Sequence, residues 1–184
     1  MKILFVSSEC APFSKSGGLA DVAFSLPPAL QKTGDDMAIV TPMYRVTQEN
    51  YGDEFERIKT CQIALGQRRL ACSLYRGALN GVTVYAIGNE HLFHRPRLYG
   101  YGDDSLRFAF FCRAVIDLLP EFGDLPDILH CNDWETALAI LYLKNDAVLR
   151  PELSHIKTVY TIHNIAYQGQ FGRSEMEATF ALPD

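Results

Sequence analysis

A lone lysine and two glycines follow the first apolar run of the sequence. The run MKILFV has strand character, and in the next stretch, SECAPFSKSGGLADVAFSLPPAL, Lys15 precedes Gly17, Gly18 and a segment of helical spacing. In a strand, turn and helix of this order, the N–H groups of the helix N-terminus and the lysine ammonium favour an anion such as a phosphate. The glycines are expected to allow positive φ and close approach of the ligand.

This turn has an alternative interpretation that the residues alone leave open. The glycine pair makes a tight turn in that interpretation, and Lys15 is simply solvated. The spacing is neither the GxxxxGK(S/T) of a P-loop nor the GxGxxG of a dinucleotide-binding fold. ATP hydrolysis and NAD-dependent dehydrogenation therefore lose their main support.

Polar side chains also follow two later apolar runs, DILHC and IKTVYTIH. Asp133 and the only tryptophan, Trp134, follow the first run, and His163 and Asn164 mark the end of the second. Because ligands bind outside the carboxyl ends of parallel strands, we expect these side chains to meet the Lys15 turn at one edge, where a carboxylate and an indole suit a sugar. Asp133 as a helix N-cap and His163 as a structural histidine remain alternatives.

Other chemistries have little support. His91 and His94 share one face of a helical turn, but they have no cysteine or carboxylate partner at metal-ligand spacing, so no metal is expected. The sequence has no GxSxG and suggests no catalytic triad. Glu9, directly after the first apolar run, is expected to face the same crevice.

The elements that must position these residues alternate along the chain. Apolar runs typical of strands covered on both faces begin at Ile3, Met37, Asp127 and Ile156. Helices are predicted over residues 19–32, 103–119 and 134–149. Pro27 and Pro28 should kink or restart the first helix, and Asp103 or Asp104 is a candidate cap for the second.

The middle of the chain is rich in β-forming residues. Residues 58–87 read as antiparallel strands separated by Gly66-Gln67 and Asn80-Gly81, and Asn-Gly is a hairpin signal. A loop rich in glycine and aromatic residues follows over residues 94–104. We predict an α/β fold: a single Rossmann-like domain over residues 1–184, with a doubly wound, mostly parallel sheet, helices on both faces and an inserted antiparallel β excursion.

Composition limits the partners. The formal net charge of -5 argues against nucleic acid and against an anionic membrane surface, because either needs a basic face. No segment approaches the roughly 18 unbroken apolar residues of a membrane span, and the first apolar run is too short for a signal peptide. The 5 cysteines form no CxxC and are odd in number, so reduced thiols and a cytoplasmic location are expected.

Three segments together resemble one enzyme family. KSGGLADV, HCNDWETAL and TIHNIAYQGQF closely resemble the N-terminal half of glycogen and starch synthases, which are retaining glycosyltransferases of the GT-B type with two Rossmann-like domains. The resemblance runs from Met1 to the end of the chain. Lys-x-Gly-Gly-Leu after the first strand is that family's signature.

The resemblance implies a reaction and roles for individual residues. Glucose would pass from ADP-glucose to the non-reducing end of an α-1,4-glucan with retention, without a metal or other cofactor. His163 and Asp133 would be catalytic, with His163 holding the transferred glucose. The substrate-binding set would be Lys15, Gly17 and Gly18 at the diphosphate, Tyr99 at the glucan, and Asp21 and Asn164 within the shared segments.

The chain also departs from the family. The second Rossmann-like domain, with its nucleotide pocket, does not fit into 184 residues, so we expect a truncated N-terminal domain that is inactive alone. ADP-glucose is favoured over UDP-glucose, although the base-reading residues would lie in the missing half. The alternative is a non-catalytic glucan-binding or regulatory domain of the same fold, which would have no need of Lys15.

Overall fold

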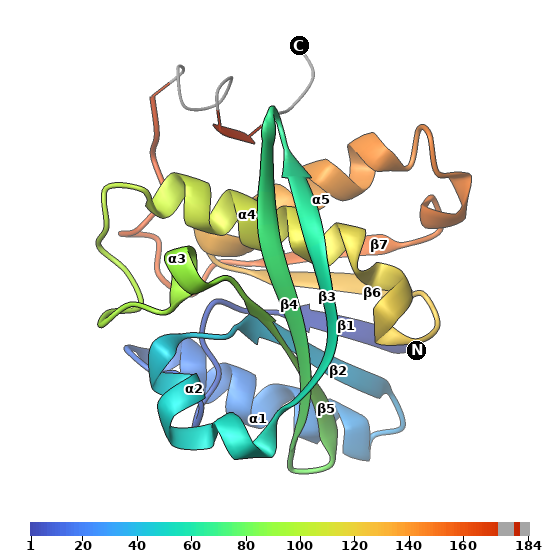
Figure 1. The fold of residues 1–184 in the computed structure, drawn as a ribbon. Coiled ribbons are helices and arrows are strands. Elements are labelled where there is room, and N and C mark those ends of the chain that lie inside the picture. The colour runs from blue at the N-terminus through green and yellow to red at the C-terminus, as the bar shows by residue number, and fades with distance from the viewer. Residues whose placement is uncertain (173–178, 181–184) are drawn as a thin grey trace.

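The computed structural model describes residues 1–172 and 179–180 (Figure 1). Within these residues, a 7-stranded sheet has the order β3-β4-β5-β2-β1-β6-β7. Its strands are β1 (Lys2–Val6), β2 (Asp36–Pro42), β3 (Glu56–Leu65), β4 (Arg68–Leu79), β5 (Val82–Gly88), β6 (Ile128–Asn132) and β7 (Lys157–Thr161). The four strands predicted from the apolar runs are β1, β2, β6 and β7, and they pair in parallel.

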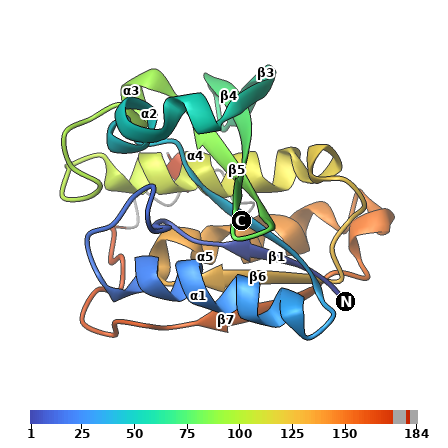
Figure 2. The same ribbon diagram turned by 90° about the horizontal axis from the view of Figure 1, so that it is seen from below.

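The central strand β1 shows how the sheet is buried. It lies between β2 and β6, and its residues alternate between two apolar clusters. Ile3 and Phe5 pack with Ala23 of helix α1 (Gly18–Lys32), whereas Leu4 and Val6 face helices α4 (Asp104–Asp117) and α5 (Trp134–Asp146). Helices therefore cover both faces, as Figure 2 shows, and the predicted fold class is confirmed.

The helices differ from their predictions in detail. Of the two predicted effects of the prolines, a kink or a restart, the restart is wrong, because α1 continues through Pro27 and Pro28. Both rings are buried, and their apolar contacts offset the lost backbone hydrogen bonds. The third helix ends at Asp146, three residues earlier than expected. Two short helices, α2 (Arg45–Tyr51) and α3 (Glu90–Phe93), flank the hairpin region.

The β excursion is only partly separate from the parallel sheet. β4 is antiparallel to both β3 and β5, but β5 pairs in parallel with β2 and so belongs to the main sheet. Asn80 (φ 50°) and Gly81 (φ 86°) both have positive φ, as the predicted hairpin turn requires. The β3–β4 hairpin lies across α4 (Figure 1), and Ile63 and Leu74 join the same apolar cluster as that helix.

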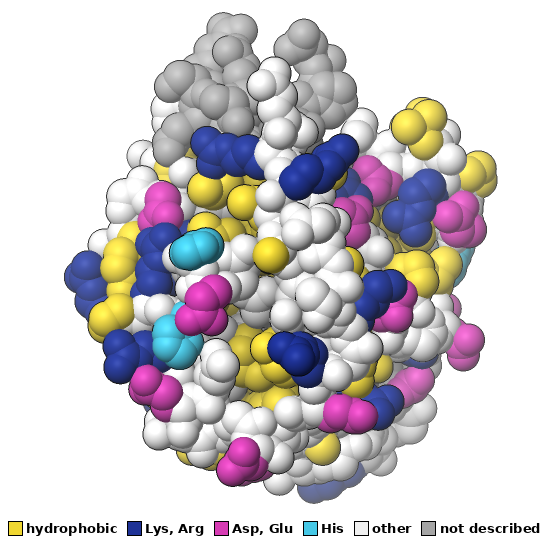
Figure 3. Space-filling model, viewed as in Figure 1, with side chains coloured by type: hydrophobic (Ala, Val, Ile, Leu, Met, Phe, Trp, Pro, Cys, Tyr) yellow, Lys and Arg dark blue, Asp and Glu magenta, His cyan; other side chains and the backbone are white. Residues whose placement is uncertain are grey.

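Charges of both signs are interspersed on the face that carries this hairpin (Figure 3). All five cysteines are free, although Cys61 lies directly opposite Cys72 in the β3–β4 register, a pairing that sequence spacing did not suggest. No helix in residues 1–172 and 179–180 is long and apolar enough to cross a bilayer.

Candidate active site

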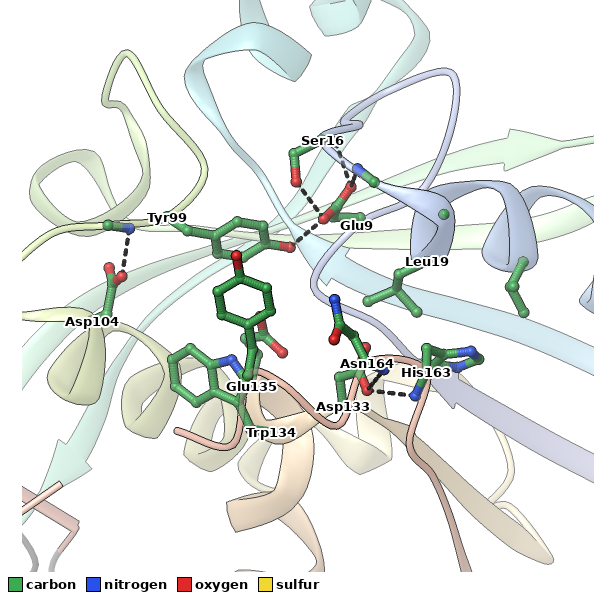
Figure 4. A pocket seen from close by; sticks show the side chains of 15 residues that line it. Glu9, Ser16, Leu19, Tyr99, Asp104, Asp133, Trp134, Glu135, His163 and Asn164 are labelled. Carbon is green, nitrogen blue, oxygen red and sulfur yellow. Dashed lines mark hydrogen bonds between the residues drawn. The ribbon is translucent and has the colours of Figure 1, made fainter. Parts of the chain in front are cut away.

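A cavity of about 870 Å³ lies at the carboxyl ends of β1, β6 and β7. Residues that follow each of these strands line it, as do the first residues of α1 and α5 (Figure 4). Of the predicted site residues, the cavity brings together Gly17, Gly18, Tyr99, Asp133, His163 and Asn164. The expectation that the strand ends converge is confirmed for these residues.

Glu9 organises the turn after β1. Its buried carboxylate accepts hydrogen bonds from the Ser16 hydroxyl (2.7 Å), the Gly17 N–H (3.1 Å) and the Tyr99 hydroxyl (2.8 Å), and also from the Ser16 N–H. The glycine turn is therefore held by a buried carboxylate as well as by its own backbone. The expectation that Glu9 faces the crevice is confirmed, because it lines the cavity.

The glycines of this turn do not need left-handed backbone. Gly17 has φ -146°, and Gly18 is not among the positive-φ residues, so the predicted use of positive φ is wrong. Glu9 fixes the turn in extended geometry instead. A Cβ at Gly17 or Gly18 would meet nothing within 4 Å, so the glycines leave open space beside the N-terminus of α1. That N-terminus has no side-chain cap among the described residues.

Lys15 and Asp21 lie beside the cavity and do not line it. The Lys15 ammonium donates to Asp21 Oδ1 at 2.6 Å, and both side chains are more than half exposed. An exposed pair of this kind contributes little to stability and exchanges its partner readily. Lys15 is thus the neighbour in sequence of Ser16, which lines the cavity. Its ammonium group can exchange Asp21 for an anion of higher charge.

Asp133 is not the side-chain cap that one alternative expected. It occupies the N-cap position of α5, but its side chain does not cap that helix. The carboxylate oxygen Oδ1 accepts from the N–H of His163 (2.7 Å) and of Asn164 (3.3 Å), which joins the ends of β6 and β7. The carboxylate is therefore a cross-strand anchor in the cavity wall.

The ring of His163 is oriented by Asn132, which the sequence analysis did not single out. The Asn132 amide nitrogen donates to the carbonyls of Val6 (3.0 Å) and His130 (3.2 Å), so its oxygen Oδ1 faces His163 Nε2 at 2.9 Å. This arrangement assigns the proton to Nε2. In the neutral ring, Nδ1 remains as an acceptor on a residue that lines the cavity.

Tyr99 reaches the cavity from the aromatic loop. Its hydroxyl lies between Glu9 and the Ser8 hydroxyl (2.9 Å), and burial raises the pKa of Tyr99 well above its usual range. The loop is closed by an ion pair of Arg95 with Asp103 at 2.7 Å. Of the two predicted cap candidates, Asp103 occupies the N-cap position of α4, but its carboxylate pairs with Arg95 and does not cap the helix. Asp104 is the first residue of the helix.

Trp134 is held by protein contacts on its ring. Gly169, with φ 58°, lies so close that a Cβ there would be 2.3 Å from the indole. Phe108 and Phe171 contact the same ring, with centroids 5.2 Å and 5.5 Å away. Trp134 thus anchors the loop after β7, and this anchoring occupies part of the ring that sugar stacking was expected to use.

Glu135 is the main cavity residue that the sequence analysis missed. It is the second residue of α5, only 8% exposed, and its oxygen Oε2 has no hydrogen-bond partner among the described residues. Burial, together with the charges of Asp133, Glu9 and Asp104, raises the pKa of Glu135 to about 8. In the sequence it looks like an ordinary acidic residue in a first helical turn, which is why no signal distinguished it.

The cavity is polarised between two ends. Gly18 and the uncapped start of α1 form one end, beside Lys15. The Glu9 carboxylate also lies at this end, where it accepts from the Gly17 N–H, and the carboxyl groups of Asp104, Asp133 and Glu135 line the remainder. The first end suits an anion, and the second suits the hydroxyl groups or a developing positive charge of a sugar. No group of three or more His, Cys, Asp and Glu side chains in the described chain is arranged to hold a metal ion.

Comparisons with known proteins show which proteins the chain is similar to. A family model described as "Starch synthase catalytic domain" matches residues 2–184. The chain is 42% identical over 174 residues to a glycogen synthase of Clostridium novyi, covering 94% of this chain and 36% of the relative. A glycogen synthase of Anoxybacillus flavithermus is 40% identical over 184 residues, covering 100% of this chain and 38% of the relative.

A solved structure extends the comparison to the fold. The catalytic domain of starch synthase IV from Arabidopsis thaliana, bound to ADP and acarbose, matches with a TM-score of 0.86 and 30% identity, covering 99% of this chain and 37% of that one. The present chain therefore spans less than two fifths of the length of each of these proteins.

Proposed function

Because the chain belongs to the starch synthase catalytic domain family, we propose that it is the N-terminal Rossmann-like domain of a glycosyltransferase. The whole enzyme transfers glucose from ADP-glucose to the non-reducing end of an α-1,4-glucan with retention. The ADP and the oligosaccharide analogue acarbose bound to the Arabidopsis relative support an adenosine nucleotide and a glucan as substrates. The free cysteines support a reducing, cytoplasmic location.

The observation that supports this function best is the polarity of the cavity. In glycosyl transfer the leaving diphosphate carries negative charge while the sugar ring becomes positive. We place the diphosphate at the N-terminus of α1, where the N–H groups of Gly18 and Leu19 lack a capping side chain in the described structure and Lys15 can leave Asp21. We place the ring near the carboxylate of Asp133, which favours its positive charge.

His163 and Asn164 hold the sugar in this proposal. With its Nε2 proton directed at Asn132, His163 has Nδ1 available to accept a hydrogen bond from a sugar hydroxyl. Asn164 uses its side-chain oxygen on the N–H of Ala166 (3.1 Å), which leaves its amide N–H groups for the ligand. Tyr99 contributes a ring at the glucan side, and transfer without a metal or other cofactor remains a prediction.

Lys15→Ala tests this function and separates it from the alternative of a non-catalytic glucan-binding domain. Binding of ADP-glucose and of maltotriose is measured by NMR titration for wild type and variant. We expect ADP-glucose binding to weaken about 10-fold, because one charge-assisted contact is lost, and maltotriose binding to persist. Lys32→Ala, at the other end of α1, is the matched control. If Lys15→Ala leaves both ligands unaffected, the glucan-binding alternative is favoured.

A further inference from the structure

Glu135 has an unusual position for a carboxylic acid. It lies in the wall of the cavity on α5, is more than nine-tenths buried, and leaves Oε2 without a hydrogen-bond partner among the described residues. Such an oxygen is costly to bury unless something else bonds to it. Figure 4 shows Glu135 between Trp134 and Asp133, on the side of the cavity that faces Tyr99. Glu135 lines the cavity with 8% of its surface exposed, so its carboxyl group lies beside a ligand there, although Oε2 itself is shielded from solvent.

The surroundings of Glu135 disfavour its charged form. Burial is the largest cause, and three nearby acidic groups add to it: Asp133 after β6, Glu9 after β1 and Asp104 at the start of α4. The charge of Glu135 in turn helps to raise the pKa of four neighbouring groups, Tyr44, Tyr99, Cys112 and Tyr160. The buried guanidinium of Arg107 is paired with Asp104. Glu135 is therefore neutral at pH 7, with a pKa of about 8.

The other acids of the cavity act as hydrogen-bond acceptors only. The Glu9 oxygens accept from Ser16, Gly17 and Tyr99, and Asp133 accepts from backbone N–H groups. Each sugar hydroxyl both donates and accepts, so a hydroxyl group beside these acids also needs a donor. A neutral carboxylic acid supplies one donor and one acceptor together, which matches a hydroxyl group.

We propose that Glu135 is a sugar-binding residue that works in its protonated form, donating its O–H to a hydroxyl oxygen of a glucose unit in the cavity. This inference rests on the proposed function and specifies one group that hydrogen-bonds to the sugar. The glucose unit belongs either to the glucan or to the sugar nucleotide, and both offer the same hydroxyl chemistry. The direct consequence is that sugar binding weakens as Glu135 ionises.

The test follows the Glu135 carboxyl and the affinity together on the 184-residue chain. Carbon-detected NMR gives the titration midpoint of Glu135 with and without maltotriose, and NMR titration gives the affinities for maltotriose and ADP-glucose at pH 7 and pH 9. We expect a midpoint near 8 that maltotriose raises, and an affinity about 10-fold lower at pH 9, where some nine-tenths of the carboxyls are ionised.

Variants isolate the carboxyl. Glu135→Gln keeps a donor and an acceptor without ionising, so its affinity should be the same at pH 7 and pH 9. Glu135→Ala should lose affinity at pH 7. Glu54→Gln, at an exposed position that does not line the cavity, should keep the wild-type pH profile. Amide spectra at both pH values establish that each variant is folded.

Several results would overturn the proposal. These are a Glu135 midpoint near the ordinary glutamate value, an affinity that is equal or higher at pH 9, or a Glu135→Gln profile that still falls with pH. If only ADP-glucose shows the Glu135-dependent fall, the glucose unit is that of the sugar nucleotide. Failure of the proposed function is a distinct result, in which wild type binds neither ADP-glucose nor maltotriose at pH 7.

Discussion

Asp133 shows how a single residue is shaped by its site. Its backbone has φ 57° and ψ 176°, a region that only glycine adopts without strain, yet an aspartate occupies it. This conformation places the carboxylate where it accepts from the N–H groups of His163 and Asn164, which joins β6 to the segment after β7. Strain of about 1–3 kcal/mol at such a position is typical of functional sites.

This strain predicts an order of stability for two variants of Asp133. Both Asp133→Gly and Asp133→Ala remove the carboxylate, but only glycine relaxes at this φ. The glycine variant should therefore unfold at higher denaturant, with a free energy of unfolding about 1–2 kcal/mol above that of the alanine variant. Urea denaturation followed by circular dichroism measures the difference, and equal stabilities would show that the backbone at Asp133 is unstrained.

The raised pKa of Glu135 predicts that the stability of the protein depends on pH. Its folded pKa of about 8 exceeds the unfolded value, so the folded state binds more protons between about pH 4.3 and pH 8. Stability from this group is therefore complete below that window and is lost as the pH rises through it. Glu135→Gln has no such loss.

The expected outcome is a pH-dependent gap between the two proteins. We compare the free energy of unfolding of Glu135→Gln with that of wild type at each pH. The difference in favour of the variant should be a few kcal/mol larger at pH 8 than at pH 4. Urea denaturation at both pH values measures this gain, with Glu54→Gln as a control of equal charge change. A constant difference across the two pH values would contradict neutral burial of Glu135.

At the scale of elements, two loops bring side chains to the cavity by different means. The loop of residues 94–104 is closed by the Arg95–Asp103 pair, and the guanidinium of Arg97 lies 5.0 Å from the Tyr101 ring, so charged groups hold Tyr99 in place. The loop after β7 is held by apolar contact instead, because Gly169 packs on the indole of Trp134.

This apolar contact predicts a local effect of Gly169→Ala. The added Cβ would lie 2.3 Å from Trp134 at positive φ, so the loop that carries Tyr167 must move. Since Trp134 is the only tryptophan, its fluorescence reports the change, and we expect emission shifted toward that of solvent-exposed indole. Gly102→Ala, where a Cβ meets nothing within 4 Å, is the control and should leave the emission unchanged. Equal spectra for all three proteins would contradict the packing of Gly169 on Trp134.

At the scale of the whole molecule, the residues that we propose to bind substrate are open to solvent. Lys15, His163 and Asn164 are all exposed, and the chain spans 36% to 38% of the length of the curated relatives compared above. The N-terminus of α1 and one lysine supply only a few charge-assisted hydrogen bonds to a diphosphate, each worth about 1.5–3 kcal/mol. This leaves little binding energy after the cost of ordering the ligand.

The prediction at this scale is that the 184-residue chain alone transfers no glucose. Incorporation of labelled glucose from ADP-glucose into glycogen measures the activity, and we expect no signal above a protein-free control. NMR titration on the same sample should still detect weak binding of ADP-glucose. Transfer at a rate typical of enzymes, of order 1 per second or more, would contradict the need for further protein groups around the diphosphate.

Much of the fold and part of the site follow from local patterns in the sequence. Apolar runs without alternation identified β1, β2, β6 and β7. β1 and β2 are buried on both faces, which selects apolar residues at nearly every position, whereas the expected burial is wrong for β7, an edge strand that is largely exposed. The rule that strand ends face the ligand then placed Asp133 and His163 at one cavity. These predictions succeeded because each depends on residues that are close together along the chain.

Contacts between segments that are distant along the chain could not be predicted from the sequence. Burial raises the pKa of Glu135, and Glu9 and Asp104, 126 and 31 residues earlier in the chain, raise it further. Trp134 loses ring surface to Gly169. Likewise Glu9, and not positive φ, fixes the glycine turn. The sequence by itself determined the strands and the residues at their ends, since apolar periodicity is a local property. Only the tertiary structure decided the charge state of Glu135, the access to the Trp134 ring and the geometry of the glycine turn. These depend on side chains that are distant in the sequence and that pack around one site and exclude water from it.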